Sequence, residues 1–370
     1  MNNNFFLDNL DLNNKGVVAR FDFNVPIVKE TISDDFRITS TLPTIESILS
    51  KNPKYLILTS HLGRPKGRDL SKSLKIIIPI LQKYLKRSIT FLEKGISQDT
   101  LDIIDSGVYL LENLRFHEEE TSYDKITDKD ENNCIKLYRK LGDVYISDAF
   151  GCLHRKHMSI YDMKYSGKEY GYGYLIKKEV DAIDKILITN KNILGIIGGN
   201  KISDKMPLIK SLASLKKSTI FVAGGLAKQY NEDINNVVIM NDGYGSDTLE
   251  DKEKIYIENY KNTSFNIYDI GDKSLRKLKE IIRQNDIIFW NGSLGVIEDE
   301  RYKVGSNNLV GYLQTECSNK YIVIGGGETA SLFEKDVPHI YVSTGGGALL
   351  EYVQNIILFN KTLPGLEIFS

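Results

Sequence analysis

Runs of apolar residues that end in glycine or polar residues recur along the second half of the chain. Each run is rich in β-branched and aromatic residues, and apolar residues at helical spacing often follow its glycines. This order is typical of a buried parallel strand that enters a helix through a tight loop. Strands are predicted over residues 193–197, 219–223, 286–290, 321–324 and 339–344. We expect the loops after them to meet at one sheet edge, where open α/β sheets bind their ligands.

In the first half, the predicted strands are followed by charged and polar residues, whereas those of the second half are followed mainly by glycines. Strands are predicted within residues 17–26, 55–67, 108–120 and 143–157, and each stretch ends in polar residues. Arg37 lies near the start of a predicted helix. At or beyond strand ends lie Arg64, Arg115 and Arg155, while Arg20 lies within its strand and only Arg276, Arg283 and Arg301 follow position 155. Arginine is therefore concentrated in one half of the chain.

A single arginine near a strand end usually forms a surface ion pair that contributes little. Several such arginines beside histidine and glycine indicate more, because the planar guanidinium group binds phosphate and carboxylate through two hydrogen bonds. We therefore predict a pocket for a small polyanion in the first half. Histidines 61, 117, 154 and 157 lack carboxylate or cysteine neighbours at zinc-ligand spacing, so hydrogen-bonding or packing roles are favoured for them.

Glycine-rich loops in the second half are candidate phosphate sites, since exposed backbone amides at a helix start attract anions. Lys201 and Lys205 are four residues apart and would share one helix face, which suits a nucleotide polyphosphate; a solvated helix start is the alternative. Glu328 follows three consecutive glycines and would be either a magnesium ligand or a helix-capping residue. The Walker A and protein-kinase H-R-D motifs are absent, and so is the G-x-G-x-x-G motif of dinucleotide-dependent dehydrogenases.

Composition adds limits to this picture. At 370 residues, the chain exceeds the roughly 250 to 300 residues that one core usually serves, so two domains are expected. A net charge of −1 gives no global attraction to nucleic acid or to an anionic membrane. Three widely spaced cysteines, and no signal-like start or membrane-length apolar run, favour a cytoplasmic protein.

The blocks of sequence at the predicted strand ends are similar to those of a known family. They include RFDFNVP, DDFRITSTLPTI, SHLGRPKG, LLENLRFHEEE, SDAFGCLHRKH, GGNKISDKM, WNGSLGVIED, IGGGETA and VSTGGGALLE. Their order along essentially the whole length is far more specific than any single glycine motif. By these blocks the chain resembles phosphoglycerate kinase.

The resemblance implies an α/β protein of two Rossmann-like three-layer domains with parallel sheets, joined by a hinge helix. Residues 1–172 would form a phosphoglycerate-binding domain, on which the tail 356–370 would pack. Residues 173–187 would form the interdomain helix, and residues 188–355 a nucleotide-binding domain. The implied reaction is reversible phosphoryl transfer from 1,3-bisphosphoglycerate to ADP, which gives 3-phosphoglycerate and ATP, with Mg²⁺ as cofactor and a monomer as the expected state.

Site residues are also implied by the match. Substrate would be bound by Asp22, Asn24, Arg37, His61, Arg64, Arg115 and Arg155. Arg37, Lys201, Gly345 and Gly346 would act on the phosphoryl group in transfer. Nucleotide would be bound by Lys205, Asn291, Glu298, Gly326, Gly327, Glu328 and Thr329, with Glu328 as the metal ligand.

Three positions depart from the family pattern. Glu328 replaces the magnesium aspartate, Ser293 replaces a proline, and the region between Gly225 and Trp290 is shortened and lacks the Gly-rich adenosine segment. These departures motivate an alternative, a phosphoglycerate-binding or regulatory homologue with weak or lost nucleotide turnover. A nucleotide-dependent dehydrogenase is the third possibility, and the missing glycine motif disfavours it.

Overall fold

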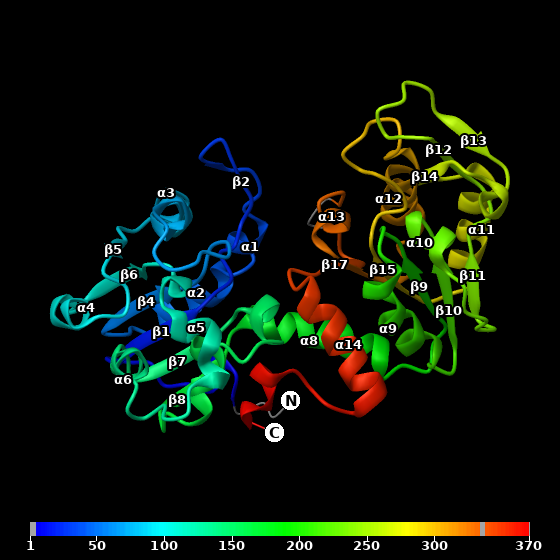
Figure 1. Ribbon diagram of the computed structural model, residues 1–370. Helices are drawn as coiled ribbons and strands as arrows, with labels where there is room; N and C mark the ends of the chain where they lie inside the picture. Colours follow the sequence, from blue (N-terminus) through cyan, green and yellow to red (C-terminus); the bar gives the residue numbers. More distant parts are fainter. Residues whose placement is uncertain (1–4, 334–336, 370) are drawn as a thin grey trace. The chain divides into compact units, whose positions relative to one another are not determined.

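The computed structural model describes residues 5–333 and 337–369, and the last residue of the predicted tail lies outside them. The chain divides into two compact units. The first runs up to Val180 and includes the segment from Thr362 onward, and the second runs from Asp181 to Lys361. Each unit contains a six-stranded parallel sheet with helices packed on it (Figure 1). The predicted fold class, two α/β domains built on parallel sheets, is confirmed.

The sheet of the first unit has the strand order β5-β6-β4-β1-β7-β8, and all of its pairs are parallel. Its strands are β1 (Gly16–Arg20), β4 (Tyr55–Thr59), β5 (Thr90–Leu92), β6 (Gly107–Leu111), β7 (Val144–Ser147) and β8 (Glu169–Tyr172). A short hairpin of β2 (Ile27–Val28) and β3 (Thr31–Ile32) follows β1. The helices are α1 (Phe36–Thr39), α2 (Leu42–Ser50), α3 (Ile78–Leu85), α4 (Gln98–Ile103), α5 (Glu118–Ser122), α6 (Asn133–Lys140) and α7 (Met158–Tyr161).

Strand β1 ends at Arg20, well before the predicted limit at Pro26. The Asp22 carboxylate accepts a hydrogen bond from the backbone N–H of Asn24 at 3.1 Å, and this local contact turns the chain away from the sheet. Phe21 and Phe23 nevertheless stay buried, with their rings stacked at a centroid distance of 5.5 Å. The polar side chains therefore leave the sheet edge on a loop that the core anchors.

The sheet of the second unit has the order β11-β10-β9-β15-β16-β17, again parallel throughout. Its strands are β9 (Ile193–Ile197), β10 (Ser218–Val222), β11 (Val237–Ile239), β15 (Ile287–Asn291), β16 (Tyr321–Gly325) and β17 (Ile340–Val342). The five predicted strands are thus neighbours in one sheet, and β11 was not predicted. The helices are α9 (Ile202–Ala213), α10 (Gly225–Gln229), α11 (Asp272–Arg283), α12 (Val304–Glu316), α13 (Gly327–Ala330) and α14 (Gly347–Phe359). Helices α9 and α14 pack side by side (Figure 1).

A small antiparallel sheet lies in the segment that is shortened relative to the family. It consists of β12 (Gly243–Ser246), β13 (Ile255–Ile257) and β14 (Asn266–Ile270), in the order β13-β12-β14. The rings of Tyr244 and Tyr256 pair across β12 and β13 at a centroid distance of 5.4 Å. The shortened segment is therefore folded, and it supplies strand β14 near the sheet edge discussed below.

Helix α8 (Tyr174–Leu187) contains the boundary between the two units. Its first turn is capped from the first unit, where Asp148 Oδ1 accepts from the backbone N–H of Ile176 at 3.0 Å. The segment after Thr362 returns to the first unit: Gly365 N donates to Leu153 O, and Tyr172 Oη donates to Gly365 O, both at 2.8 Å.

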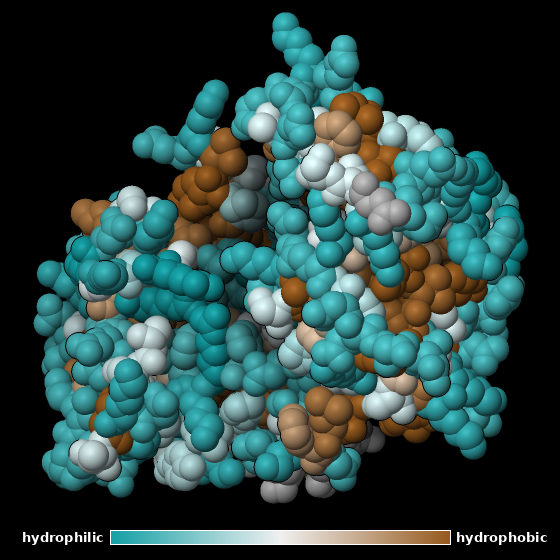
Figure 2. Space-filling view, turned by 45° about the vertical axis from the view of Figure 1, so that its right-hand side comes forward, coloured by the Kyte–Doolittle hydropathy of each residue, from teal (hydrophilic) through white to brown (hydrophobic). Residues whose placement is uncertain are grey.

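Figure 2 shows a face on which hydrophilic side chains predominate and hydrophobic ones form separate patches. Singly exposed apolar residues, such as Leu70 and Ile188, are ordinary features of a protein surface. Across the described residues, no helix has both the length and the apolar character required to cross a membrane.

Candidate functional site

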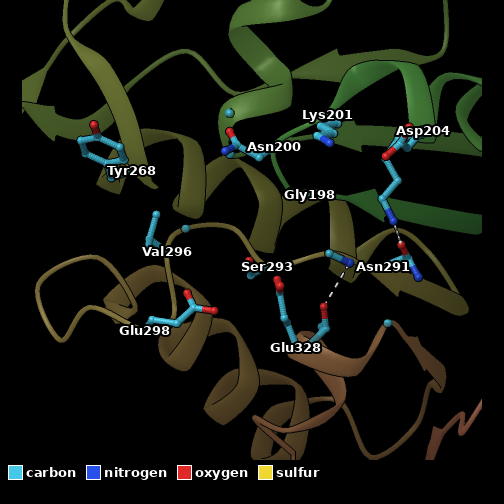
Figure 3. A pocket seen from close by; sticks show the side chains of 18 of the residues that line it. Gly198, Asn200, Lys201, Asp204, Tyr268, Asn291, Ser293, Val296, Glu298 and Glu328 are labelled. Atoms are coloured by element: carbon cyan, nitrogen blue, oxygen red, sulfur yellow. Dashed lines mark hydrogen bonds between the residues drawn. The ribbon is translucent and has the colours of Figure 1, made fainter. Parts of the chain in front are cut away.

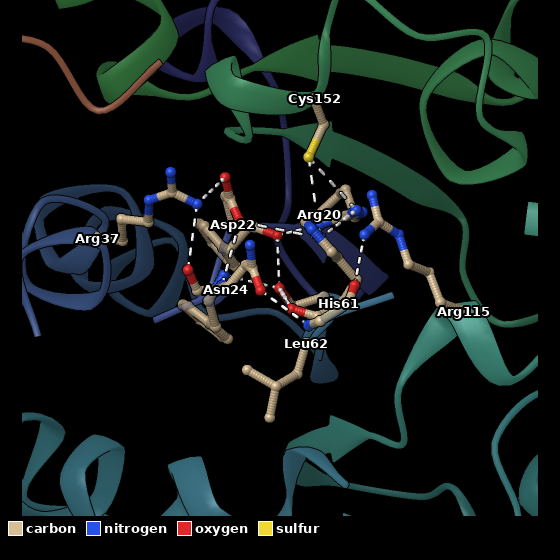
Figure 4. Close-up of polar contacts among 12 residues, drawn as sticks. Arg20, Asp22, Asn24, Arg37, His61, Leu62, Arg115 and Cys152 are labelled. Atoms are coloured by element: carbon tan, nitrogen blue, oxygen red, sulfur yellow. Dashed lines mark hydrogen bonds and ion pairs between the residues drawn. The ribbon is translucent and has the colours of Figure 1, made fainter. Parts of the chain in front are cut away.

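The first unit gathers polar side chains from the loops after β1 and β4 (Figure 4). Arg37 Nη1 donates to Asp22 Oδ2 at 2.9 Å and to the backbone oxygen of Asn24 at 3.2 Å. Asn24 Oδ1 accepts from the backbone N–H of Gly63 at 2.8 Å. Two strand-end loops and helix α1 are therefore tied together by the predicted residues.

Arg20 lies at the centre of this network although the sequence placed it only within a strand. Its side chain is 2% exposed, and its Nε donates to Ser159 Oγ at 2.9 Å. Its Nη2 lies 3.6 Å from Glu120 Oε1 and 3.2 Å from His61 Nδ1. Because a guanidinium group only donates, His61 Nδ1 must accept, and the ring proton must reside on Nε2.

His61 is held neutral by the same surroundings. Burial is the main cause that lowers the pKa of His61 well below its usual range, and the positive charges of Arg20 and Arg115 lower it further. A neutral imidazole with its proton on Nε2 is a hydrogen-bond donor at that atom over the whole physiological pH range. Because an anionic ligand accepts hydrogen bonds, this N–H donor suits an anion.

The other predicted arginines differ in how firmly they are held. Arg115 Nη1 donates to Gly63 O at 2.5 Å, and its backbone N–H is capped by Asn113 Oδ1 at 3.0 Å. Its Nε atom is buried and has no hydrogen-bond partner among the described residues. Arg155 Nε donates to His154 Nε2 at 3.0 Å, and Arg64, directly after Gly63, is exposed.

The donor set of Asp22, His61 and Cys152 could in principle hold a metal ion, because one ligand atom from each lies within 4.8 Å of the others. However, Arg20 Nη2 lies 3.2 Å from His61 Nδ1 and 3.7 Å from Cys152 Sγ. A guanidinium cation thus occupies the position that a metal cation would need. The geometry supports an anion site rather than a metal site.

The second unit contains a cavity of about 830 Å³ at the ends of β9, β10, β15 and β16 (Figure 3). Close approach of two loops shapes its floor: a Cβ atom on Gly292 would lie 2.2 Å from the backbone oxygen of Gly198, so only glycine fits there. Glycines supply much of the lining, as the sequence predicted: Gly198, Gly199, Gly224, Gly225, Gly292, Gly295, Gly326 and Gly327.

Two lysines and a carboxylate mark one end of this cavity. Lys201 is the exposed N-cap residue of α9, and Lys205, one turn later, donates to Asn291 Oδ1. Burial lowers the pKa of Lys205, while the charges of Asp204 and Glu328 partly oppose this effect. Glu328 lies in the first turn of α13, and the neighbouring Thr329 Oγ1 accepts from the backbone N–H of Gly292 at 3.0 Å.

All of the predicted nucleotide residues line the cavity together, whereas Gly345 and Gly346, which were predicted to act on the phosphoryl group, do not. The cavity is lined by Lys205, Asn291, Glu298, Gly326, Gly327, Glu328 and Thr329, and also by Lys201. Gly346 instead forms the N-cap of α14, and neither it nor Gly345 is part of the lining. Their contact with the phosphoryl group stays a prediction.

Sequence reasoning missed two kinds of residue. Arg20 carried a detectable signal, because an arginine inside the apolar run VVARF must be buried and must therefore have partners. Asn200 and Tyr268 also line the cavity and were not singled out. Tyr268 comes from β14, so its place depends on an antiparallel sheet that the apolar pattern did not predict.

Comparisons with known proteins agree with one another. A family model described as phosphoglycerate kinase matches residues 7–263 and 228–355. Phosphoglycerate kinase of Tetrahymena thermophila is 35% identical, over 96% of this chain and 94% of the relative. Phosphoglycerate kinase of Aquifex aeolicus is 33% identical, over 97% and 96%.

Solved structures show the same resemblance. The structure of phosphoglycerate kinase from Coxiella burnetii has a TM-score of 0.77 and 26% identity, over 98% of both chains. That of the enzyme from Pyrococcus horikoshii has a TM-score of 0.83 at 23% identity, also over 98% of both chains, and at this identity it supports the fold alone. Since the family model and full-length relatives agree with the arginine-rich loops and the glycine-lined cavity, the chain belongs to the phosphoglycerate kinase family.

Proposed function

We propose that this chain catalyses reversible phosphoryl transfer from 1,3-bisphosphoglycerate to ADP, with 3-phosphoglycerate and ATP as products. The observation that carries the proposal is the division of charged groups between the units. The first unit holds Arg37 of helix α1 against the loop after β1 and has Arg115 and Arg155 beyond strand ends, and the second has a glycine-lined cavity with Lys201 and Lys205. No comparison favours the alternative of a homologue that binds phosphoglycerate without turning over nucleotide.

In the first unit, the arginines bind the phosphate and carboxylate of the glycerate substrate. Arg37 is already oriented by Asp22 and by the backbone of Asn24. Arg115 is anchored by the bond from its Nη1 to Gly63 O, so its charge is held at the site. His61 contributes an Nε2–H donor, and Arg64 and Arg155 add charge at the rim.

In the second unit, backbone amides at the starts of α9 and α13 and the ammonium group of Lys205 bind the nucleotide phosphates. Glu298 contacts the ribose. Glu328 and the Thr329 hydroxyl group offer oxygen ligands, which Mg²⁺ prefers, so the donor set fits a magnesium nucleotide. Bound magnesium would neutralise phosphate charge.

The reaction needs little from the protein beyond positioning and charge. In the ATP-consuming direction the attacking group is a carboxylate, and its pKa of about 4 leaves it ionised at neutral pH, so no general base is required. Arg37 and Lys201 stabilise the negative charge of the phosphoryl group in transfer, as do backbone amides. We expect Gly345 and Gly346 at the start of α14 to supply some of these amides.

A coupled spectrophotometric assay tests the proposal. Purified protein, 3-phosphoglycerate and magnesium nucleotide should produce 1,3-bisphosphoglycerate, with turnover that depends on all three. Binding of 3-phosphoglycerate without turnover by any nucleotide would instead favour the non-catalytic alternative. We also expect a cytoplasmic monomer; the free thiols of Cys134, Cys152 and Cys317 suit a reducing compartment.

A further inference from the structure

The end of the cavity away from Lys205 has a different character. Figure 3 shows Tyr268 and Val296 there, and Leu249 and Ile267 are the other apolar side chains that line the cavity. Since the lysines and glycine-rich helix starts attract the phosphates, the flat base of a bound nucleotide is directed to this apolar end. The inference that follows rests on the proposed nucleotide site.

The Tyr268 ring is held in a fixed position, so a base can pack against it. It is tilted against the Tyr302 ring at a centroid distance of 5.1 Å, and Tyr302 is fully buried. The Tyr302 hydroxyl group lies 3.1 Å from Ser246 Oγ, which fixes its position. A partly exposed aromatic ring with this backing offers a stacking surface for any base.

Asn200 carries a side-chain amide between that end and the lysines. In Figure 3 it lies between Tyr268 and Lys201, with its amide turned toward Tyr268. Its backbone is held in place because Gln229 Nε2 donates to Asn200 O at 2.7 Å. The residue opposite must be small: a Cβ atom on Gly225 would lie 2.2 Å from Asn200 Oδ1. The lack of a side chain at Gly225 thus makes room for this amide.

The Asn200 amide is available to a ligand. The other amide side chain in the lining, Asn291, is fully buried, and its Oδ1 accepts from Lys205. Within residues 5–333 and 337–369, no hydrogen bond is made by the Asn200 side chain. It therefore presents both a carbonyl acceptor and N–H donors to the cavity.

We propose that Asn200 reads the nucleobase and makes the site selective for adenine. An amide can accept from the 6-amino group of adenine while it donates to N7, a pairing in which both partners are satisfied. A 6-oxo purine presents two acceptors side by side, so the amide carbonyl loses its partner. Tyr268 stacks against any base, whereas the two hydrogen bonds of Asn200 select adenine.

Calorimetric binding of three magnesium nucleotides to the full chain tests the proposal: ADP, inosine diphosphate and 7-deaza-ADP. Inosine diphosphate lacks the 6-amino donor, and 7-deaza-ADP lacks the N7 acceptor. We expect the wild-type protein to bind ADP about tenfold or more tightly than either analogue, the range expected for one bidentate base contact. Asn200→Ala should bind all three with affinities within about threefold of each other. Asn307→Ala, the same change at an exposed site of α12 outside the cavity, should keep the wild-type preference.

Two results would overturn the proposal. One is equal binding of ADP and both analogues by the wild-type protein, a result that needs no variant. The other is an equal loss of affinity for all three in Asn200→Ala, which would place the amide on the sugar or phosphates. Failure of the proposed function would appear differently, as selective binding without turnover in the coupled assay.

Discussion

Arg37 and Lys201 are held in opposite ways, although both are assigned to the phosphoryl group. Arg37 is fixed by two hydrogen bonds, to Asp22 and to the backbone of Asn24. Lys201 is exposed at the N-cap of α9, where its charge opposes the helix dipole. A lysine in this position lowers helix stability, so its presence is explained by a ligand that needs the charge.

Arg37→Ala and Lys201→Ala should each lower kcat by about 10² or more, the effect of losing one preorganised donor, with a smaller change in KM. Steady-state kinetics in the ATP-consuming direction measures both constants. Arg276→Ala and Lys277→Ala, at exposed positions of α11 outside the cavity, are matched controls and should leave both constants unchanged. A large rise in KM at constant kcat would show that Arg37 and Lys201 only bind substrate.

Glu328 is the residue at which an active site and a decaying one would differ. It lies in the first turn of α13, close enough to Lys205 for its charge to act on that lysine. If the loop places the longer Glu328 carboxylate at the correct distance from the magnesium ion, Glu328→Asp should lower kcat/KM. The variant should also bind magnesium more weakly, because magnesium tolerates little error in ligand position. Magnesium titrations of both proteins measure the effect, and a higher kcat/KM for Glu328→Asp would contradict the fitted arrangement.

The sequence predicted residues whose role follows from a nearby strand end. The arginine-rich loops and glycine loops belong to this class, because apolar runs locate the sheet edge and parallel strands meet there. Asn200 could not be recognised in this way, since its access to the cavity depends on Gly225, which belongs to helix α10, a different element of the fold. The central position of Arg20 likewise depends on Glu120 and Ser159, far along the chain.

At the scale of elements, buried parallel strands were predicted well and the antiparallel sheet was not. Strands β9, β10, β15, β16 and β17 have continuous apolar runs, and their observed ends differ little from those expected. Strand β12 contains Gly243 and Gly245, which read as a loop in the sequence. A Cβ on Gly245 would lie 1.7 Å from Asn266 O of β14, so these glycines are required by strand pairing, a tertiary effect.

Helix α8 begins at a buried carboxylate, which predicts a pH effect on stability. Asp148 is fully buried and caps the helix, and burial raises its pKa to about 7. The folded state therefore holds a proton that the unfolded state, with an ordinary aspartate pKa near 4, has lost. Stability falls as the pH rises from about 4 to about 7, by roughly 1.4 kcal/mol per pH unit.

Asp148→Asn should remove this slope while it keeps an acceptor for the Ile176 N–H. Relative to the wild type, the variant should become more stable by about 1 kcal/mol or more between pH 5 and pH 7, as measured by urea unfolding followed by circular dichroism. Asp148→Ala, which also loses the cap, should cost about 1 kcal/mol at every pH. An Asn variant with the same pH slope as the wild type would show that Asp148 does not titrate in this window.

At the scale of the whole molecule, the two groups of site residues belong to separate units. Arg37 lies in the first unit and Lys201 in the second. Transfer of one phosphoryl group between them predicts a domain closure, with α8 as the candidate hinge. Small-angle scattering should give a smaller radius of gyration with 3-phosphoglycerate and a non-hydrolysable ATP analogue together than with either alone. An unchanged radius with both ligands would contradict closure.

The return of the last residues to the first unit has a consequence for how the protein is made. Leu363 and Leu366 are buried there, and Gly365 bonds to Leu153 and Tyr172. On the ribosome, the chain up to Val180 emerges long before these residues do, so the first unit stays incomplete while the second is being synthesised. The second unit is contiguous in sequence and can finish folding first, although its residues are translated later.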